Sequence, residues 1–152
     1  MESFGLLIGH LLGDYILQND WMAGWKGASG HILTQKEQSR IDMATADERD
    51  RVFDQVHAWS ELRPPLACTL HCALYTLAVW LCACWWMPWW GPLVVFATHW
   101  PMDRYRLASW WMKNVSGQET FAGGVFAPWA IIVVDNTIHL LVLFLVGLAA
   151  GL

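Results

Sequence analysis

The sequence predicts an all-α integral membrane protein with four transmembrane helices in one bundle. Two observations indicate this class. The 152-residue chain is 56% hydrophobic, has a mean hydropathy of +0.33 and contains 12 Trp, which is rich in apolar residues for a water-soluble domain. Of its nine basic and 13 acidic side chains, 13 in all lie between Lys26 and Arg63, so the rest of the chain carries little charge. Such a contrast is typical of a membrane protein with one water-exposed loop.

Four apolar stretches define the expected helices. They cover about residues 3–20, 66–87, 92–112 and 126–148. A helix crosses the bilayer core with about 20 residues, in a range of about 17–25, so the last three are long enough and the first would finish at the interface. No Lys or Arg precedes the first stretch, which disfavours a cleaved signal peptide. We expect a single membrane domain over 1–152, with a long polar loop over about 22–64 between the first two helices.

The basic residues predict the orientation of this bundle. The loop 22–64 holds six of them, the turn 87–92 holds none, and Lys113 follows the third helix. The positive-inside rule then places the loop in the cytoplasm and both termini outside, in the inner (cytoplasmic) membrane. The net charge of −4 gives no support for a nucleic-acid-binding surface, so the expected partner is the lipid bilayer.

The second half of the loop carries a helix signal. Thr45 followed by Glu48 fits a capping box. Val52, Val56 and Trp59 are spaced for one helix face. This segment is expected either to lie against the bundle as an amphipathic helix or to be a solvated connector.

Acidic and imidazole side chains recur inside the apolar stretches. Three of the four expected helices contain a His and an Asp four residues apart: His10 and Asp14, His99 and Asp103, and Asp135 and His139. The remaining helix contributes His71. A spacing of four places both side chains on one helix face, and ionisable groups at membrane depth usually face an interior site. Counted from the cytoplasmic ends at about 1.5 Å per residue, these residues fall in one overlapping layer.

This residue set predicts a metal centre. Imidazole nitrogen and carboxylate oxygen suit divalent transition metals, zinc or manganese foremost, and helical bundles build such sites from inward-facing residues. The candidate ligands are His10, Asp14, His71, His99, Asp103, Asp135 and His139. They exceed the four of a closed zinc site, so either two ions bind or some residues support the ligands. Two divalent ions against three carboxylates leave a charge of +1, which suits an anionic substrate.

A metal that activates water would make the protein a metal-dependent hydrolase. In this interpretation Asp103 and Asp14 are the catalytic carboxylates, and Arg104 and Arg106 bind the substrate. Two adjacent cations favour a phosphoester or a lipid-linked substrate.

Three other functions stay open. A relay of Asp and His could serve a small ion or proton transporter or a pore-forming protein. Four intramembrane His could serve a non-catalytic haem-binding or metal-binding electron-transfer protein, although paired Asp residues argue against haem. The polar residues could also only pack helices together, without any ligand. The four cysteines lack the spacing of a zinc signature and are expected to be small apolar packing residues: Cys68, Cys72, Cys82 and Cys84.

Three motifs together resemble a known family. They are LLIGHLLGDYILQNDWMA at 6–23, THWPMDRYR at 98–106 and VVDNTIHLL at 133–141. They are similar to an uncharacterised bacterial and phage membrane protein family, domain of unknown function 3307, and more loosely to membrane-bound metal-dependent hydrolases. The resemblance implies an integral membrane protein, and its looser part adds to the expectation of a hydrolase.

Overall fold

The computed structural model describes residues 2–28, 32–83 and 87–151, and all regular structure within them is helical. In chain order the helices are α1 (Glu2–Leu11), the π-helical turn η1 (Leu12–Ile16), α2 (Asp20–Trp25), α3 (Gln35–Asp42), α4 (Arg49–Ala83), α5 (Gly91–Arg104), α6 (Leu107–Asn114), α7 (Glu119–Gly123) and α8 (Ala127–Ala150). The predicted all-α class is confirmed. Two helices, α4 and α8, are long and apolar enough to cross a membrane.

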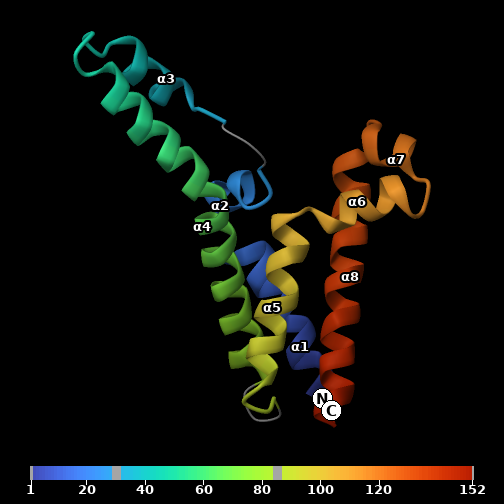
Figure 1. The fold of residues 1–152 in the computed structure, drawn as a ribbon. Coiled ribbons are helices and arrows are strands. Elements are labelled where there is room, and N and C mark those ends of the chain that lie inside the picture. The colour runs from blue at the N-terminus through green and yellow to red at the C-terminus, as the bar shows by residue number, and fades with distance from the viewer. Residues whose placement is uncertain (1, 29–31, 84–86, 152) are drawn as a thin grey trace.

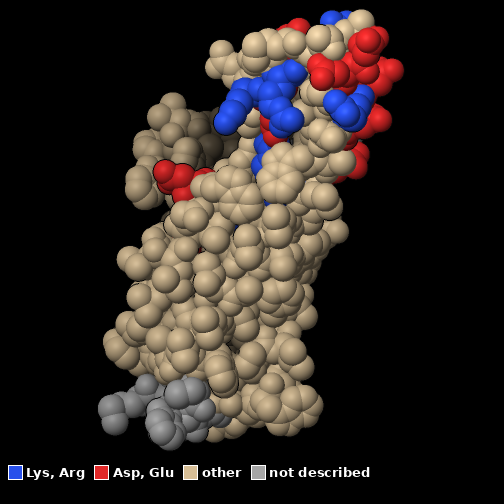
Figure 2. Space-filling view, turned by 90° about the vertical axis from the view of Figure 1, so that its left-hand side faces the viewer, with Lys and Arg blue, Asp and Glu red and all other residues tan. Residues whose placement is uncertain are grey.

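Four elements form the bundle that positions the site (Figure 1). α1 packs on α4 and α8, and α5 packs on the same two helices. Both chain ends lie at one end of the bundle, whereas α3, the start of α4, and α6 with α7 lie at the other. The two ends of the molecule therefore differ in composition. Figure 2 shows Lys, Arg, Asp and Glu gathered at the end that carries α3, and the lower half of that face is almost bare of them.

The bundle has an apolar surface, and its largely apolar interior holds a group of buried polar side chains. Large hydrophobic side chains are exposed on all of its helices, among them Phe4, Leu70, Leu93 and Phe144. The buried polar side chains include His10, His71, His99, Asp103 and His139. Only five of the 24 residues of α8 are buried, and one of them is His139. In water-soluble domains, buried charged groups and large exposed apolar patches are both rare.

Glycines fix how closely α1 approaches α4. Gly5, Gly9 and Gly13 are spaced by four residues and face α4. A Cβ added at Gly9 would lie 2.5 Å from the Val79 Cα, and one added at Gly13 would lie 2.6 Å from the Tyr75 ring. Small residues at this spacing let two helix backbones approach closely, as in membrane helix pairs. They hold η1, and with it Asp14, against α4.

Gly9→Leu is therefore expected to separate α1 from α4 and to destabilise the protein. Overpacking costs about 1–3 kcal/mol, and here the obstructing atoms belong to a backbone that cannot move aside. Thermal or denaturant unfolding in detergent, followed by circular dichroism, measures the loss. Gly24→Leu is the matched control, because Gly24 is exposed and nothing lies within 4 Å of a Cβ added there. Equal stability of Gly9→Leu and the wild type would contradict this packing.

The predicted loop over 22–64 is mostly helical, which corrects the expectation from sequence. It contains α2, α3 and the first part of α4, which runs unbroken through Pro64 and Pro65 to Ala83. The amphipathic segment that begins near Thr45 joins the apolar helix end to end. Of the predicted apolar face, Val56 is 2% exposed and packs, whereas Trp59 is 45% exposed, so only part of this face is covered. The predicted helix 66–87 also covers residues 84–86, which lie outside the described residues, as does Cys84.

Two other predicted helices are shorter than expected. The stretch 3–20 ends with η1, and Asn19 then caps α2 by accepting a hydrogen bond from the Met22 backbone N–H at 2.9 Å. The stretch 92–112 divides into α5 and α6 at Arg106, which has a left-handed backbone with φ of 52°. Pro101, one turn earlier, lacks the N–H that would continue the hydrogen-bond ladder, which weakens the helix before this break. The last stretch, 126–148, agrees closely with α8.

Candidate metal centre

Four elements bring six of the predicted ligands together in the middle of the bundle. η1 supplies Asp14, α4 supplies His71, α5 supplies His99 and Asp103, and α8 supplies Asp135 and His139. Their ligand atoms form two triads, each with all atoms within 4.8 Å of one another. The first triad is Asp14, His71 and His99; the second triad is Asp103, Asp135 and His139. The six residues come from segments far apart in the sequence, so the fold alone assembles them.

The first triad has the spacing of a metal site once Asp103 is included. His71 Nε2 lies 3.2 Å from Asp14 Oδ1, 3.1 Å from His99 Nε2 and 3.0 Å from Asp103 Oδ2. His99 Nε2 lies 3.7 Å from Asp14 Oδ1 and 3.3 Å from Asp103 Oδ2. Ligands about 2.0–2.1 Å from a tetrahedral zinc ion are separated by about 3.3 Å. These five distances are close to that value, so the ligand atoms need little movement to bind an ion.

The second triad has one imidazole already oriented. His139 Nδ1 donates to the backbone carbonyl of Asp135 at 2.8 Å. Its Nε2 therefore carries the lone pair, and this atom is buried without a hydrogen-bond partner. Asp103 Oδ1 lies 3.9 Å away, and Asp135 Oδ2 lies 3.6 Å from Nδ1. A ligating histidine usually has its other ring nitrogen held in this way. Asp103 faces both triads, with Oδ2 toward the first and Oδ1 toward the second.

His10, the seventh predicted ligand, lies behind Asp14. Its Nε2 donates to Asn136 Oδ1 at 2.8 Å, and its Nδ1 lies 2.9 Å from the Tyr75 hydroxyl and 3.3 Å from Asp14 Oδ2. Both ring nitrogens are thus in use, and the side chain is fully buried. With Nε2 donating, Nδ1 accepts from the Tyr75 hydroxyl, so His10 is held by Asn136 and Tyr75 beside Asp14 rather than at a position that contacts an ion. Asp14 itself lies in the π-helical turn η1, and such turns frequently occur at functional sites.

Lys26 belongs to the site although sequence reasoning missed it. Its ammonium lies 2.9 Å from Asp103 Oδ2 and 3.3 Å from His71 Nε2. Burial alone would lower the pKa of Lys26, but the Asp103 carboxylate outweighs that effect and raises it, so the ammonium stays charged. The sequence signal was weak, because Lys26 is only one of six basic residues in a polar stretch. With Lys26 counted, a single divalent ion already balances the three carboxylates, and the charge argument for two ions loses its force.

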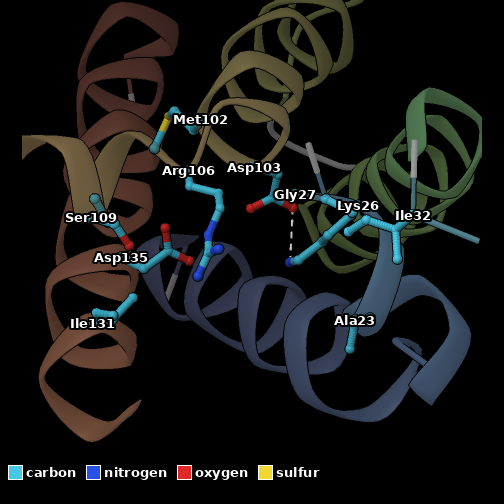
Figure 3. Close-up of a pocket in the computed structure, with 13 residues that line it drawn as sticks. Ala23, Lys26, Gly27, Ile32, Met102, Asp103, Arg106, Ser109, Ile131 and Asp135 are labelled. Atoms are coloured by element: carbon cyan, nitrogen blue, oxygen red, sulfur yellow. Dashed lines mark ion pairs between the residues drawn. The ribbon is translucent and has the colours of Figure 1, made fainter. Parts of the chain in front are cut away.

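A cavity of about 440 Å³ opens beside the two triads, between α2, α5, α6 and α8 (Figure 3). Asp103 and Asp135 line it on the side of the centre, and Lys26, Arg106 and Ser109 line it as well. Figure 3 shows the Arg106 side chain pointing into it, and the dashed line marks the Lys26–Asp103 ion pair.

The two arginines predicted to bind substrate have different positions. Arg106 lines the cavity. Arg104 instead donates from Nη1 to the backbone carbonyl of Ala28 at 2.8 Å, which ties the segment after α2 to the end of α5. Asp14 and Asp103, the predicted catalytic carboxylates, both lie in the cluster, but of the two it is Asp103 that also lines the cavity.

One cysteine lies at the edge of the cluster. A Cys72 ligand atom is within 4.8 Å of those of His99 and Asp103, and Cys68 Sγ is 3.9 Å from Cys72 Sγ. Both thiols are buried, as expected for apolar packing residues. The spacing of the cysteines in the sequence does not connect them with the histidines, because these side chains lie on different helices and come into contact only in the folded protein.

No family model, curated protein or solved structure matches the chain. The resemblance of its motifs to a membrane family thus stays a prediction, and the function is argued from the site alone. The described residues offer a buried set of imidazoles and carboxylates that could hold a metal ion. A cavity with two cations and a hydroxyl lies directly beside it.

Proposed function

We propose that this protein is a metal-dependent hydrolase of the inner membrane, whose bundle holds one or two divalent transition-metal ions and acts on a phosphoester or a lipid-linked substrate. The observation that carries the proposal is the convergence of four ligand atoms at 3.0–3.7 Å inside a bundle with an apolar surface. Two carboxylates buried this closely repel each other unless positive charge balances them. The Lys26 ammonium supplies one positive charge beside Asp103, and a divalent ion would supply the rest.

The membrane location is supported by the surface of the bundle. α4 and α8 are each long enough to span, and α1 with η1 forms a shorter apolar helix over Phe4–Ile16. Exposed apolar residues on α1, α4, α5 and α8 would face lipid, which has no need of polar partners. We propose four membrane-embedded helices, with α3 and the start of α4 in the cytoplasm and both termini outside.

Site-directed tags test this orientation. An epitope at either terminus should be accessible from outside intact cells. The same epitope inserted between Ala44 and Thr45 should be labelled only after the cells are opened, because this turn joins α3 to α4 at the charged end of the molecule. Labelling of all three positions from one side would overturn the arrangement.

The proposed chemistry assigns a role to each group around the cavity. A divalent ion in the first triad would supply a Lewis acid that activates water. Asp103 would hold the ion, while Asp135, which lines the cavity, would accept the proton of the attacking water. Asp14 would serve as a ligand. Arg106 would bind the substrate anion through its planar set of donors.

Release of phosphate or headgroup from labelled lipids tests this chemistry. Protein treated with a chelator should lose activity and regain it with zinc or manganese. Arg106→Gln should raise KM about tenfold or more with a smaller effect on kcat, because a hydrogen bond to a charged group contributes about 1.5–3 kcal/mol. Arg40→Gln, exposed on α3, is the control. Metal-loaded protein that releases nothing from a broad lipid and lipid-linked panel would contradict the hydrolase and leave transport or structure as the better interpretation.

A further inference from the structure

Lys26 occupies the position that a cation would take in the centre. Its Nζ lies 2.9 Å from Asp103 Oδ2 and 3.3 Å from His71 Nε2, and these two atoms are themselves 3.0 Å apart. A zinc ion would need both atoms at about 2.0–2.2 Å. An ammonium ion and a metal ion cannot use the same two lone pairs at once. Binding of the metal therefore requires the Lys26 side chain to move.

The cavity gives the displaced side chain a place to go. Lys26 lies at the end of the short helix α2, lines the cavity and keeps 19% of its side chain exposed. Its stem has four rotatable carbons, so the ammonium can move by several ångströms without backbone change. Arg106 is its neighbour there: a Cβ added at Gly27 would lie 2.8 Å from Arg106 Cγ. The two cationic side chains come from different segments of the chain and line the same cavity.

The cavity fits an anion joined to an apolar group. Lys26, Arg106 and the Ser109 hydroxyl offer donors to three oxygens, and Ile32, Met102 and Ile131 form apolar walls. A phosphate monoester has three free oxygens and a charge of about −1.5 to −2 at neutral pH. The two cations would balance it once a bound divalent ion offsets the Asp103 and Asp135 carboxylates, which also line the cavity.

We propose that Lys26 is an exchangeable cation, which pairs with Asp103 and His71 in the metal-free protein and, once a metal ion binds, moves into the cavity and binds a phosphate group together with Arg106. This inference rests on the proposed metal centre and deepens it. It makes metal and phosphate binding mutually reinforcing, because the metal releases a donor that the phosphate then uses. Coupling of this kind is reciprocal.

Metal affinity in the absence of any anion is the first test. Purified wild type, Lys26→Gln and Lys26→Arg are dialysed against Mn²⁺ in detergent, with helix content checked by circular dichroism. Lys26→Gln should bind Mn²⁺ about tenfold more tightly, a typical size for coupling between sites, because no cation has to be displaced. Lys26→Arg keeps the charge and should resemble the wild type. Equal or weaker binding by Lys26→Gln would overturn the proposal.

Phosphate binding to the Mn²⁺-loaded proteins is the second test. Here Lys26→Gln should lower the affinity, whereas in the first test it should raise the affinity for Mn²⁺. Lys26→Gln should bind phosphate about tenfold more weakly than the wild type, whereas Lys26→Arg should not. Inorganic phosphate in detergent and phosphatidic acid in phosphatidylcholine vesicles are compared, so that a free phosphate and a lipid headgroup are told apart. Equal phosphate affinity of wild type and Lys26→Gln would overturn the proposal, as would no binding of either probe.

The metal centre and the exchange of Lys26 can be contradicted separately. If neither the wild type nor Lys26→Gln binds Mn²⁺ or zinc, the metal centre is wrong and the role of Lys26 falls with it. If the wild type binds metal but Lys26→Gln binds it no more tightly, only the exchange is wrong. The hydrolase proposal then stands on its own assay.

Discussion

Asp103→Asn is expected to remove metal from the protein and to abolish turnover. Asp103 lies 3.0 Å from His71 and 3.3 Å from His99 through one oxygen, and faces His139 through the other at 3.9 Å. Losing it should weaken metal binding by more than the about 10–100-fold that loss of an outer hydrogen-bonding partner costs. Elemental analysis after dialysis against dilute zinc or manganese measures the loss, and the lipid-release assay measures turnover.

The control is Asp54→Asn, an exposed carboxylate on α4 far along the chain from the cluster. It changes the same charge and should change neither metal content nor activity. Asparagine fits the volume of aspartate, so circular dichroism should show unchanged helix content in both variants. Full metal content in Asp103→Asn would exclude the proposed centre.

Much of the candidate site could be predicted because its residues stand out against an apolar background. An Asp and a His four residues apart in a hydrophobic stretch predict a buried polar site, because burial of such groups without a partner is costly. The structure brings six of the seven into the two triads. What the spacing cannot tell is which residue contacts an ion and which supports another. His10 has the same spacing as the ligands, yet both of its ring nitrogens are used by Asn136 and Tyr75.

The fold was less predictable in the charged part of the chain. Hydropathy located α8 well, because apolar residues occupy most of its length. It did not find the continuity of α4, because the first part of that helix is polar and the second apolar. Helix packing had left a readable signal in Gly5, Gly9 and Gly13, spaced by four residues. Lys26 could not be found this way, because its role depends on a contact across segments.

Arg63→Ala is expected to detach α3 from α4. Arg63 is 2% exposed, forms an ion pair with Glu37 of α3, and lies with its guanidinium 4.0 Å from the centre of the Trp25 ring. Removing one partner of a fully buried pair costs about 3–5 kcal/mol. Glu37 is partly buried and keeps its hydrogen bonds from Thr34, so the loss here should be smaller than that. Hydrogen exchange of the α3 amides, or proteolysis in the turn between α3 and α4, should report the detachment.

Arg51→Ala provides the comparison. Its pair with Glu48 spans 3.8 Å, and the two side chains are 70% and 51% exposed, so its loss should change almost nothing.

The contact between Glu37 and Arg63 should also depend on pH. Burial raises the pKa of Glu37, but hydrogen bonds from Thr34 and Arg63 outweigh it and leave the pKa below the ordinary value of 4.5. The stabilisation is thus complete above that value and is lost as the pH falls below it. Equal protection of the α3 amides in Arg63→Ala and Arg51→Ala would contradict the proposed role of Arg63.

The early end of α5 has a consequence for the membrane itself. With 14 residues it is about 21 Å long, against a hydrocarbon core of about 30 Å. The neighbouring helix α8, with 24 residues, reaches about 36 Å. If the bundle lies in a bilayer as proposed, local thinning is one way to meet this mismatch, and it would draw lipid headgroups inward where α5 stops. The cavity lies at that stop, so the acyl-chain length of the surrounding lipids would set how far a headgroup phosphate must sink to reach Arg106.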